Sequence, residues 1–392
     1  MARTQEAEAE LRDHGLDGLV LYANGSTLGN QARTHGYMRY FCDFDSHNFP
    51  AVFILRPGEP AVLITGNANA RNNRDVGWEK SLWVRGIRHV TAQALGDEIV
   101  KVLGAGNGAP RRVAYLGYNE TLAPVWKAIE RGLPGVEWDH EFGARVLDKH
   151  RVQKSPQALA IHRHAAEICD LMFARLAREV RSGKPGYQLQ AAMEHTAKEE
   201  GCEYCLIWLT VLPHADFSRF NKEECLRAPQ EGDQVLAGIY IIYEGHWGHA
   251  IRTGNVGEPT PEHRLLYDRV NQMIDAGLGK IRPGDNLHDV NTAMTKVWQK
   301  YYQPHEIRRS RPGHGLGYSY EDPIVSQAFP YAWNVKDGPQ PEPIVIKPGM
   351  LMELHPQIWV PGAGGAMIGE MVAATDTGYE VLTRYPRALQ VW

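Results

Sequence analysis

Four segments in the second half of the sequence carry side chains that can transfer protons or bind metal ions. Their candidate residues are His214, His249, His314, Glu353 and Glu370. Histidine changes its charge near neutral pH, so an imidazole can act as a general acid, a general base or a metal ligand. Glu353 lies within the apolar run Met350–Leu354, where an unpaired carboxylate would be costly. We therefore expect Glu353 to be paired, protonated or bound to a ligand.

The histidines differ in their local sequence. His314 is flanked by two glycines, which let the backbone approach a ligand closely. His246 and His249 are three residues apart on a predicted strand, so their side chains point to opposite faces and only one of them faces a site. His214 follows a proline, and its sequence alone leaves both a catalytic and a structural role open.

The elements that position these residues are predicted to form two domains. Over the first 150 residues, apolar runs predict strands at 18–22, 49–55, 60–65, 112–117 and 136–138, with helices at 4–14, 92–103 and 120–132. Strands interleaved with helices are typical of an α/β domain. Ser155 and Pro156 then provide the N-cap and the first position of a long helix. We therefore place the domain boundary at residue 150.

The second domain contains an internal repeat. Residues 184–190 and 282–288 have similar sequences, and each opens an amphipathic helix that follows a longer one. Strand-rich segments, 206–257 and 343–384, come after the two helix pairs. The repeat predicts a pseudo-twofold domain with a cleft between its halves, where the candidate residues would meet.

Composition excludes several classes of protein. The chain has 392 residues, of which 43% are hydrophobic and 22% charged, as in ordinary globular proteins. A net charge of -4 leaves no basic excess for a phosphate backbone, so we expect no nucleic-acid partner. No apolar run approaches the roughly 20 residues of a membrane span, and the first residues do not resemble a signal peptide. The odd, sparse count of five cysteines indicates reduced thiols and a cytoplasmic location.

Several segments, in their order along the chain, resemble the pita-bread superfamily of creatinases, prolidases, aminopeptidases P and methionine aminopeptidases. The matching segments are Arg151–Pro156, Gly232-Asp233, Arg252-Thr253, His314–Gly317, Lys347–Met350 with Glu353, and Thr377–Thr383. The resemblance implies an α+β protein with an N-terminal α/β cap domain of the creatinase and prolidase type (1–150) and a pita-bread catalytic domain (151–392). It also implies a homodimer in which a cap-domain loop, here containing His47 and Asn48, closes the site of the other subunit.

The departures from the superfamily pattern concern its metal ligands. Metallopeptidases of this superfamily hold two metal ions with two aspartates, one histidine and two glutamates. The matching positions here are Gly238, His249, His314, Glu353 and Gly369, with Glu370 one residue later. Because two neighbouring divalent ions need bridging carboxylates, the resemblance favours the metal-free creatinase branch. In that branch a histidine performs acid–base chemistry, and His214 is the nearest match.

The leading hypothesis is therefore a creatinase-like hydrolase without a cofactor, cleaving a C–N bond other than an ordinary peptide bond in a small polar metabolite. We expect a catalytic set and a substrate-binding set of residues. The catalytic set is His214, His314, Glu353 and Glu370, and the binding set is His249, Arg252, Tyr320, His47 and Asn48. Creatine itself is not expected, because Ile251 stands where creatinases use a glutamate to hold a guanidinium. A lyase reaction with the same groups stays open, as does an aromatic substrate.

Two other hypotheses use the same fold. In the first, His249, His314 and Glu353 hold one divalent metal ion, since two histidines and a carboxylate suit iron, zinc or manganese, and the protein is a hydrolase or lyase. In the second, the chain is a non-catalytic binding protein that has lost its ligands.

Overall fold

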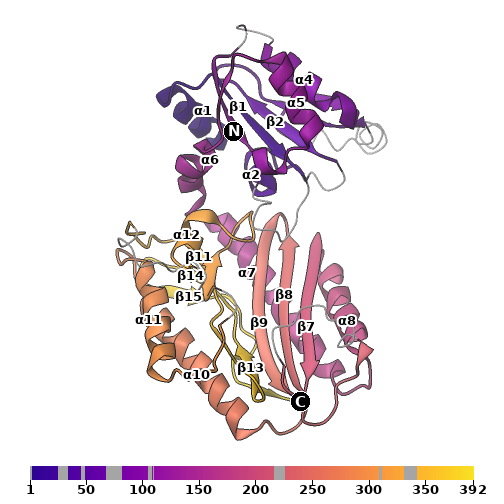
Figure 1. Ribbon diagram of the computed structural model, residues 1–392, viewed down its shortest axis with the longest axis vertical. Helices are drawn as coiled ribbons and strands as arrows, with labels where there is room; N and C mark the ends of the chain where they lie inside the picture. Colours follow the sequence, from indigo (N-terminus) through magenta and orange to yellow (C-terminus); the bar gives the residue numbers. More distant parts are fainter. Residues whose placement is uncertain are drawn as a thin grey trace. The chain divides into compact units, whose positions relative to one another are not determined.

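The computed structural model describes residues 2–24, 34–45, 49–67, 82–104, 108, 110–215, 226–308, 311–330 and 342–392. The chain divides into two compact units (Figure 1). The N-terminal unit comprises Met1–Arg151 with Tyr318–Tyr320, and the C-terminal unit comprises Val152–Gly317 with Glu321–Trp392. None of the helices in the described ranges combines the length and the apolar character that crossing a membrane would require.

The N-terminal unit is built on one six-stranded sheet with the strand order β4-β3-β2-β1-β5-β6. Its strands are β1 (Gly18–Ala23), β2 (Ala51–Leu55), β3 (Val62–Gly66), β4 (Gly86–Val90), β5 (Arg112–Leu116) and β6 (Glu137–Asp139). Its α-helices are α1 (Ala2–Asp13), α2 (Thr34–Cys42), α4 (Leu95–Gly104), α5 (Ala123–Gly132) and α6 (Phe142–Arg145), and 3-10 helices occupy Ala92–Ala94, Tyr118–Glu120 and Leu147–Arg151. The apolar run of β1 is buried on both faces, so helices cover both sides of the sheet.

The C-terminal unit repeats one pattern twice, with two helices followed by strands. Its first half contains α7 (Pro156–Glu179), α8 (Gly186–Glu199), β7 (Tyr204–Leu212), β8 (Gln234–Tyr243) and β9 (His246–Asn255). Its second half contains α10 (Pro261–Leu278), α11 (His288–Lys300), β10 (Gly313–Gly315), α12 (Pro323–Gln327), β11 (Leu351–Leu354), β12 (Gln357–Val360), β13 (Gly364–Met367), β14 (Glu370–Ala374), β15 (Tyr379–Val381) and β16 (Gln390–Val391). The predicted α+β organisation of this part of the chain, with two similar halves, is confirmed.

The long helices of the two halves begin with the same kind of N-terminal cap. Ser155 accepts a hydrogen bond from the backbone of the third helical residue of α7 at 3.2 Å, and Thr260 does the same for α10 at 3.2 Å. Proline follows each cap at the first helical position, where a missing N–H costs nothing. One apolar face of α7 packs on β7–β9, and one of α10 packs on the strands of the second half.

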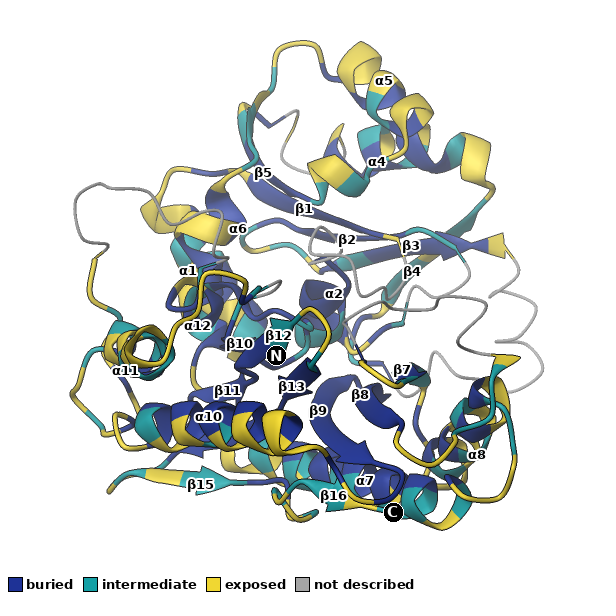
Figure 2. Cartoon of the chain, turned by 60° about the horizontal axis from the view of Figure 1, so that its bottom comes forward, coloured by how far each residue is buried: buried dark blue, intermediate teal, exposed yellow. Residues whose placement is uncertain are grey.

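Two sheets carry the candidate residues. One has the order β16-β9-β8-β7 and the other β10-β11-β14-β15. Strands β8 and β9 are buried along nearly their whole length (Figure 2). Ile251 of β9 forms an antiparallel bridge with Gly369, just before β14. This bridge joins the two halves beside the candidate residues.

Candidate metal centre

Three strand segments bring four side chains to one point. His249 comes from β9, His314 from β10, and Glu353 from β11, with His355 directly after that strand. His314 and Glu353 are register partners in the β10–β11 pair. His355 continues this pairing, because its N–H donates to the carbonyl oxygen of Pro312 at 2.9 Å. Residues two apart on a strand share a face, so Glu353 and His355 point the same way.

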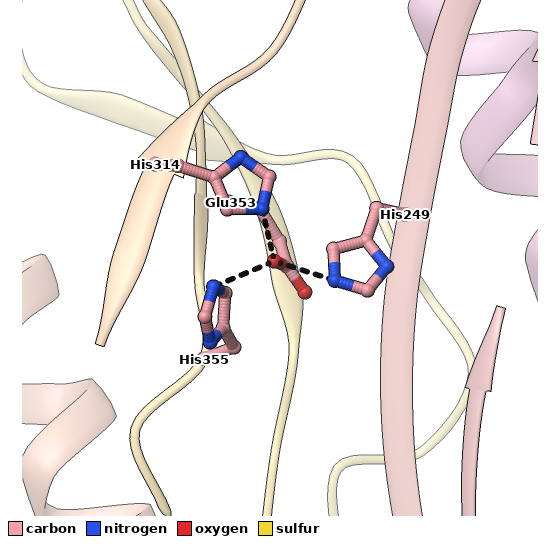
Figure 3. A group of neighbouring side chains, drawn as sticks. All are labelled: His249, His314, Glu353 and His355. Carbon is pink, nitrogen blue, oxygen red and sulfur yellow. Dashed lines mark ion pairs between the residues drawn. The ribbon is translucent and has the colours of Figure 1, made fainter. Parts of the chain in front are cut away.

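The three imidazoles converge on one carboxylate oxygen of Glu353 (Figure 3). Its Oε2 lies 3.0 Å from His249 Nε2, 3.4 Å from His314 Nε2 and 3.5 Å from His355 Nε2. One ligand atom from each residue lies within 4.8 Å of the others. Neither carboxylate oxygen of Glu353 accepts a hydrogen bond from a described residue. Among the described residues, the centre therefore holds buried carboxylate oxygens that accept no hydrogen bond.

Backbone carbonyls fix the orientation of two imidazoles. His249 Nδ1 lies 2.8 Å from the carbonyl oxygen of Ile239, and His314 Nδ1 lies 2.9 Å from that of Gly315. A carbonyl oxygen only accepts, so in each neutral ring Nδ1 carries the proton and Nε2 presents a lone pair toward Glu353. Metal-binding histidines in proteins are oriented by the same kind of contact.

Burial favours the uncharged forms of Glu353, His314 and His355. All four side chains are at most 4% exposed. Burial raises the pKa of Glu353 well above its usual range, with His314 opposing the shift. Burial also lowers the pKa of His314, and it lowers the pKa of His355 well below the usual value. An uncharged imidazole is the form of histidine that binds a metal ion.

The donor set fits one transition-metal ion. Three imidazole nitrogens and a carboxylate oxygen are ligands that suit zinc, iron or manganese. A second ion would need further carboxylates, but Gly238 and Gly369 have no side chains to offer. A Cβ atom built at Gly369 would collide with Glu353 Oε1. The Glu353 side chain thus fills the space that a residue at position 369 would need.

Glu370 points away from this group of four and pairs with a buried arginine. Arg252 contacts Glu370 at 3.1 Å, and the hydroxyl of Thr383 donates to the same carboxylate. Arg252 also donates to the carbonyl oxygens of Gly369 and Tyr385, each at 2.8 Å. These bonds tie β9 to Gly369, just before β14, and to Tyr385, after β15.

The other predicted site residues lie apart from the four. His214 is exposed in a turn after β7. Tyr320 is half-buried and belongs to the N-terminal unit. His47 and Asn48 lie outside the described residues. Their roles stay predictions.

His355 was not among the predicted site residues, because it does not match a ligand position of the superfamily resemblance. A usable signal was present, because Glu353 and His355 are two residues apart in a predicted strand and must share a face. His246, by contrast, lies on the other side of β9, where its ring contacts that of His162 with centroids 5.0 Å apart.

Comparison with known proteins shows the family. The sequence profile of metallopeptidase family M24 matches residues 160–376. The chain belongs to this family. YkvY of Bacillus subtilis, whose name proposes a dipeptidase, is 25% identical over 394 residues, covering 99% of each chain. A peptidase of Staphylococcus aureus named as uncharacterized is 26% identical over 244 residues, covering 60% of this chain and 63% of that protein.

Solved structures confirm the pita-bread fold together with the N-terminal α/β domain. The prolidase from Pyrococcus horikoshii superposes with a TM-score of 0.79 at 17% identity, over 99% of this chain and 100% of that one. The Xaa-Pro dipeptidase from Bacillus anthracis superposes with a TM-score of 0.76 at 20% identity, over 100% and 99% of the two chains.

Three expectations drawn from the sequence are wrong. The M24 family consists of metallopeptidases and the relatives are named as peptidases, so a creatinase-like hydrolase of small metabolites is overturned. Action on bonds other than ordinary peptide bonds is overturned for the same reason, although the hydrolase class agrees with the family. The absence of a cofactor is overturned by the family and by the four converging ligands. The carboxylates missing at positions 238 and 369 pointed away from a metal, whereas His355 adds a further possible nitrogen ligand beside His249, His314 and Glu353.

Proposed function

We propose that the protein is a metal-dependent peptidase that hydrolyses short peptides, with dipeptides as the first class to test. In this proposal one divalent transition-metal ion is held by His249, His314, Glu353 and His355. The observation that carries it is the convergence of three imidazole Nε2 atoms on one buried carboxylate oxygen. The membership of family M24 and the dipeptidase name of a relative aligned over 99% of its length support the choice of substrate.

The ion would supply Lewis acidity, which polarises a peptide carbonyl group and lowers the pKa of a water molecule. Neighbouring backbone groups of the chain orient the side chains that would bind the ion. The carbonyl oxygens of Ile239 and Gly315 keep the Nε2 lone pairs of His249 and His314 directed at the centre. Glu353 contributes the negative charge that balances part of the cation's charge.

Arg252 is a positioning residue in this proposal. Its guanidinium bonds the carbonyl oxygens of Ile251 at 2.9 Å and Gly369 at 2.8 Å. The bond to Gly369 fastens the strand of His249 to the half of the domain that carries Glu353. Glu370 neutralises the arginine within the protein, so the pair supports the centre without joining it.

The test compares two buried histidines on the same strand. His249→Gln removes a proposed ligand, whereas His246→Gln alters the opposite side of β9. Each variant is loaded with zinc, manganese or iron(II). Hydrolysis of a panel of dipeptides is then measured as the amount of free amino acids released. We expect metal-dependent hydrolysis by the wild type and by His246→Gln, and a loss of at least about 100-fold in His249→Gln. No hydrolysis by the metal-loaded wild type, or equal activity of the two variants, would contradict the proposal.

Two finer expectations join this proposal. On the superfamily resemblance, we propose a homodimer in which a loop with His47 and Asn48 approaches the other subunit's site. Sedimentation equilibrium tests the dimer, and a mixed dimer of His249→Gln and Asn48→Ala subunits tests the loop. Restored activity in the mixture supports the shared site, and its absence contradicts the shared site.

We also propose a cytoplasmic location, which is tested by fractionating cells that express the protein.

A further inference from the structure

The imidazole of His314 is held by a backbone group whose own position is fixed by a neighbouring segment. His314 Nδ1 lies 2.9 Å from the carbonyl oxygen of Gly315. Gly315 forms an antiparallel bridge with Asp322, and the Asp322 N–H donates to the same carbonyl oxygen at 2.9 Å. The oxygen that orients His314 is therefore also bonded to the residue that directly precedes α12.

The N–H of Gly315 is bonded to a side chain of α12. It donates to Ser326 Oγ at 3.0 Å, and the Ser326 hydroxyl donates to the carbonyl oxygen of Asp322 at 2.6 Å. Ser326 is 4% exposed and Asp322 is 1% exposed. Because these groups are buried, a lost bond would leave a backbone N–H without a partner, which is costly. Gly315 is thus held at both its N–H and its carbonyl oxygen by residues 322–326.

A buried ion pair anchors this segment within the C-terminal unit. Lys154 Nζ lies 2.5 Å from Asp322 Oδ2, and the two side chains are 7% and 1% exposed. The backbone N–H of Lys154 donates to the carbonyl oxygen of Gly349 at 2.7 Å. The bridge itself is close-packed, because a Cβ atom built at Gly315 would lie 2.8 Å from the Asp322 carbonyl oxygen. Residues 322–326 are therefore a fixed support for the strand of His314.

We propose that Ser326 is a positioning residue for the metal ligand His314. Its hydroxyl fixes Gly315, whose carbonyl oxygen keeps the His314 ring proton on Nδ1. The Nε2 lone pair then stays directed at the centre. This inference rests on the proposed function, since it assigns a role in metal binding at the same site. Groups that orient metal-binding side chains contribute roughly 10–100-fold to metal affinity.

A second buried hydroxyl in the same unit provides a matched control. Thr253 Oγ1 donates to the carbonyl oxygen of Met367 at 2.8 Å and accepts from the Met367 N–H at 3.1 Å. Thr253 and Ser326 are both buried, and each bonds one backbone N–H and one carbonyl oxygen. Ser326→Ala and Thr253→Val therefore remove comparable bonds. A difference between them in metal binding separates positioning of His314 from a general loss of stability.

Zinc affinity is measured by competition with a coloured chelator, at a temperature at which each variant is folded. We expect Ser326→Ala to bind zinc at least about tenfold more weakly than the wild type, and Thr253→Val to bind it equally well. Ser326→Thr keeps the hydroxyl and should retain the affinity. If Ser326→Ala does not fold, Ser326→Cys replaces it, because a thiol is a weaker hydrogen-bonding group. Unchanged affinity without the hydroxyl, or an equal loss in Thr253→Val, overturns the inference.

Nuclear magnetic resonance of the metal-free protein separates this inference from the proposed function. With isotope-labelled histidine, the ring-nitrogen signals show which nitrogen carries the proton, and His314→Gln identifies the signals of His314. We expect the proton on Nδ1 in the wild type and in Thr253→Val, and a mixture of both tautomers in Ser326→Ala. This pattern in a protein that binds no zinc would support the positioning role and refute the metal centre. Zinc binding by the wild type, with the same tautomer and affinity in Ser326→Ala, would support the metal centre and refute the positioning role.

Discussion

His249 Nε2 lies 3.0 Å from Glu353 Oε2, although the two residues belong to different sheets. Both side chains are buried, and no described residue donates a hydrogen bond to the carboxylate. Burial of acceptors without donors costs free energy, and a bound cation removes that cost. The contact between the halves of the domain is therefore the place where a metal ion would link them.

Removal of His355 tests the ligand that sequence reasoning missed. We expect His355→Ala to bind zinc at least about 100-fold more weakly than the wild type, because one of four donors is lost. Competition with a coloured chelator measures the affinity. His246→Gln serves as the control, and an unchanged affinity in His355→Ala would remove this residue from the ligand set.

Metal removal should weaken the fold, because the ligands come from both sheets. A ligand that binds only the folded state stabilises it by about 2.7 kcal/mol at 100 times Kd. Dialysis against a chelator should therefore lower the Tm, and added zinc should restore it. Calorimetry measures this change in Tm for the wild type and for His249→Gln. A Tm that responds equally to zinc in both proteins would count against binding at this centre.

Loss of Arg252 should destabilise the protein more than loss of an exposed arginine. Arg252→Met leaves Glu370 buried without its cation, which we expect to cost about 3–5 kcal/mol. The pair of Arg163 with Glu380 is partly exposed, so Arg163→Met should cost at most about 1 kcal/mol. Urea unfolding measures both values.

A double variant of the Arg252–Glu370 pair separates the contribution of the buried charge to stability from that of packing. Adding Glu370→Gln to Arg252→Met should recover part of the lost stability, because it removes the uncompensated carboxylate. No recovery would mean that packing and backbone bonds, rather than the buried charge, account for the cost.

Much of the fold could be predicted because its signals are local. The apolar run of β1 and the Ser-Pro and Thr-Pro helix starts are found close to where the sequence places them. Strand β4 was not predicted, because Gly86–Val90 contains an arginine and a histidine and its residues are only partly buried or exposed. Edge strands of this kind lack the continuous apolar run that marks a central strand.

The site was harder to predict because its residues meet only through tertiary structure. His249 and Glu353 are more than a hundred residues apart in the sequence, and they become neighbours through tertiary contacts such as the bridge between Ile251 and Gly369. The sequence also suggested a cleft role for Glu370, whereas its carboxylate pairs with Arg252. The direction in which the Glu370 side chain points depends on tertiary packing, which the spacing of residues in the sequence does not reveal.

The metal content of the purified, tag-free protein tests the central claim most directly. Elemental analysis by mass spectrometry counts the ions per chain in the wild type, His249→Gln and His246→Gln. The account predicts about one transition-metal ion per chain in the wild type and in His246→Gln, and almost none in His249→Gln. Two ions per chain, or an equal content in all three proteins, would contradict it.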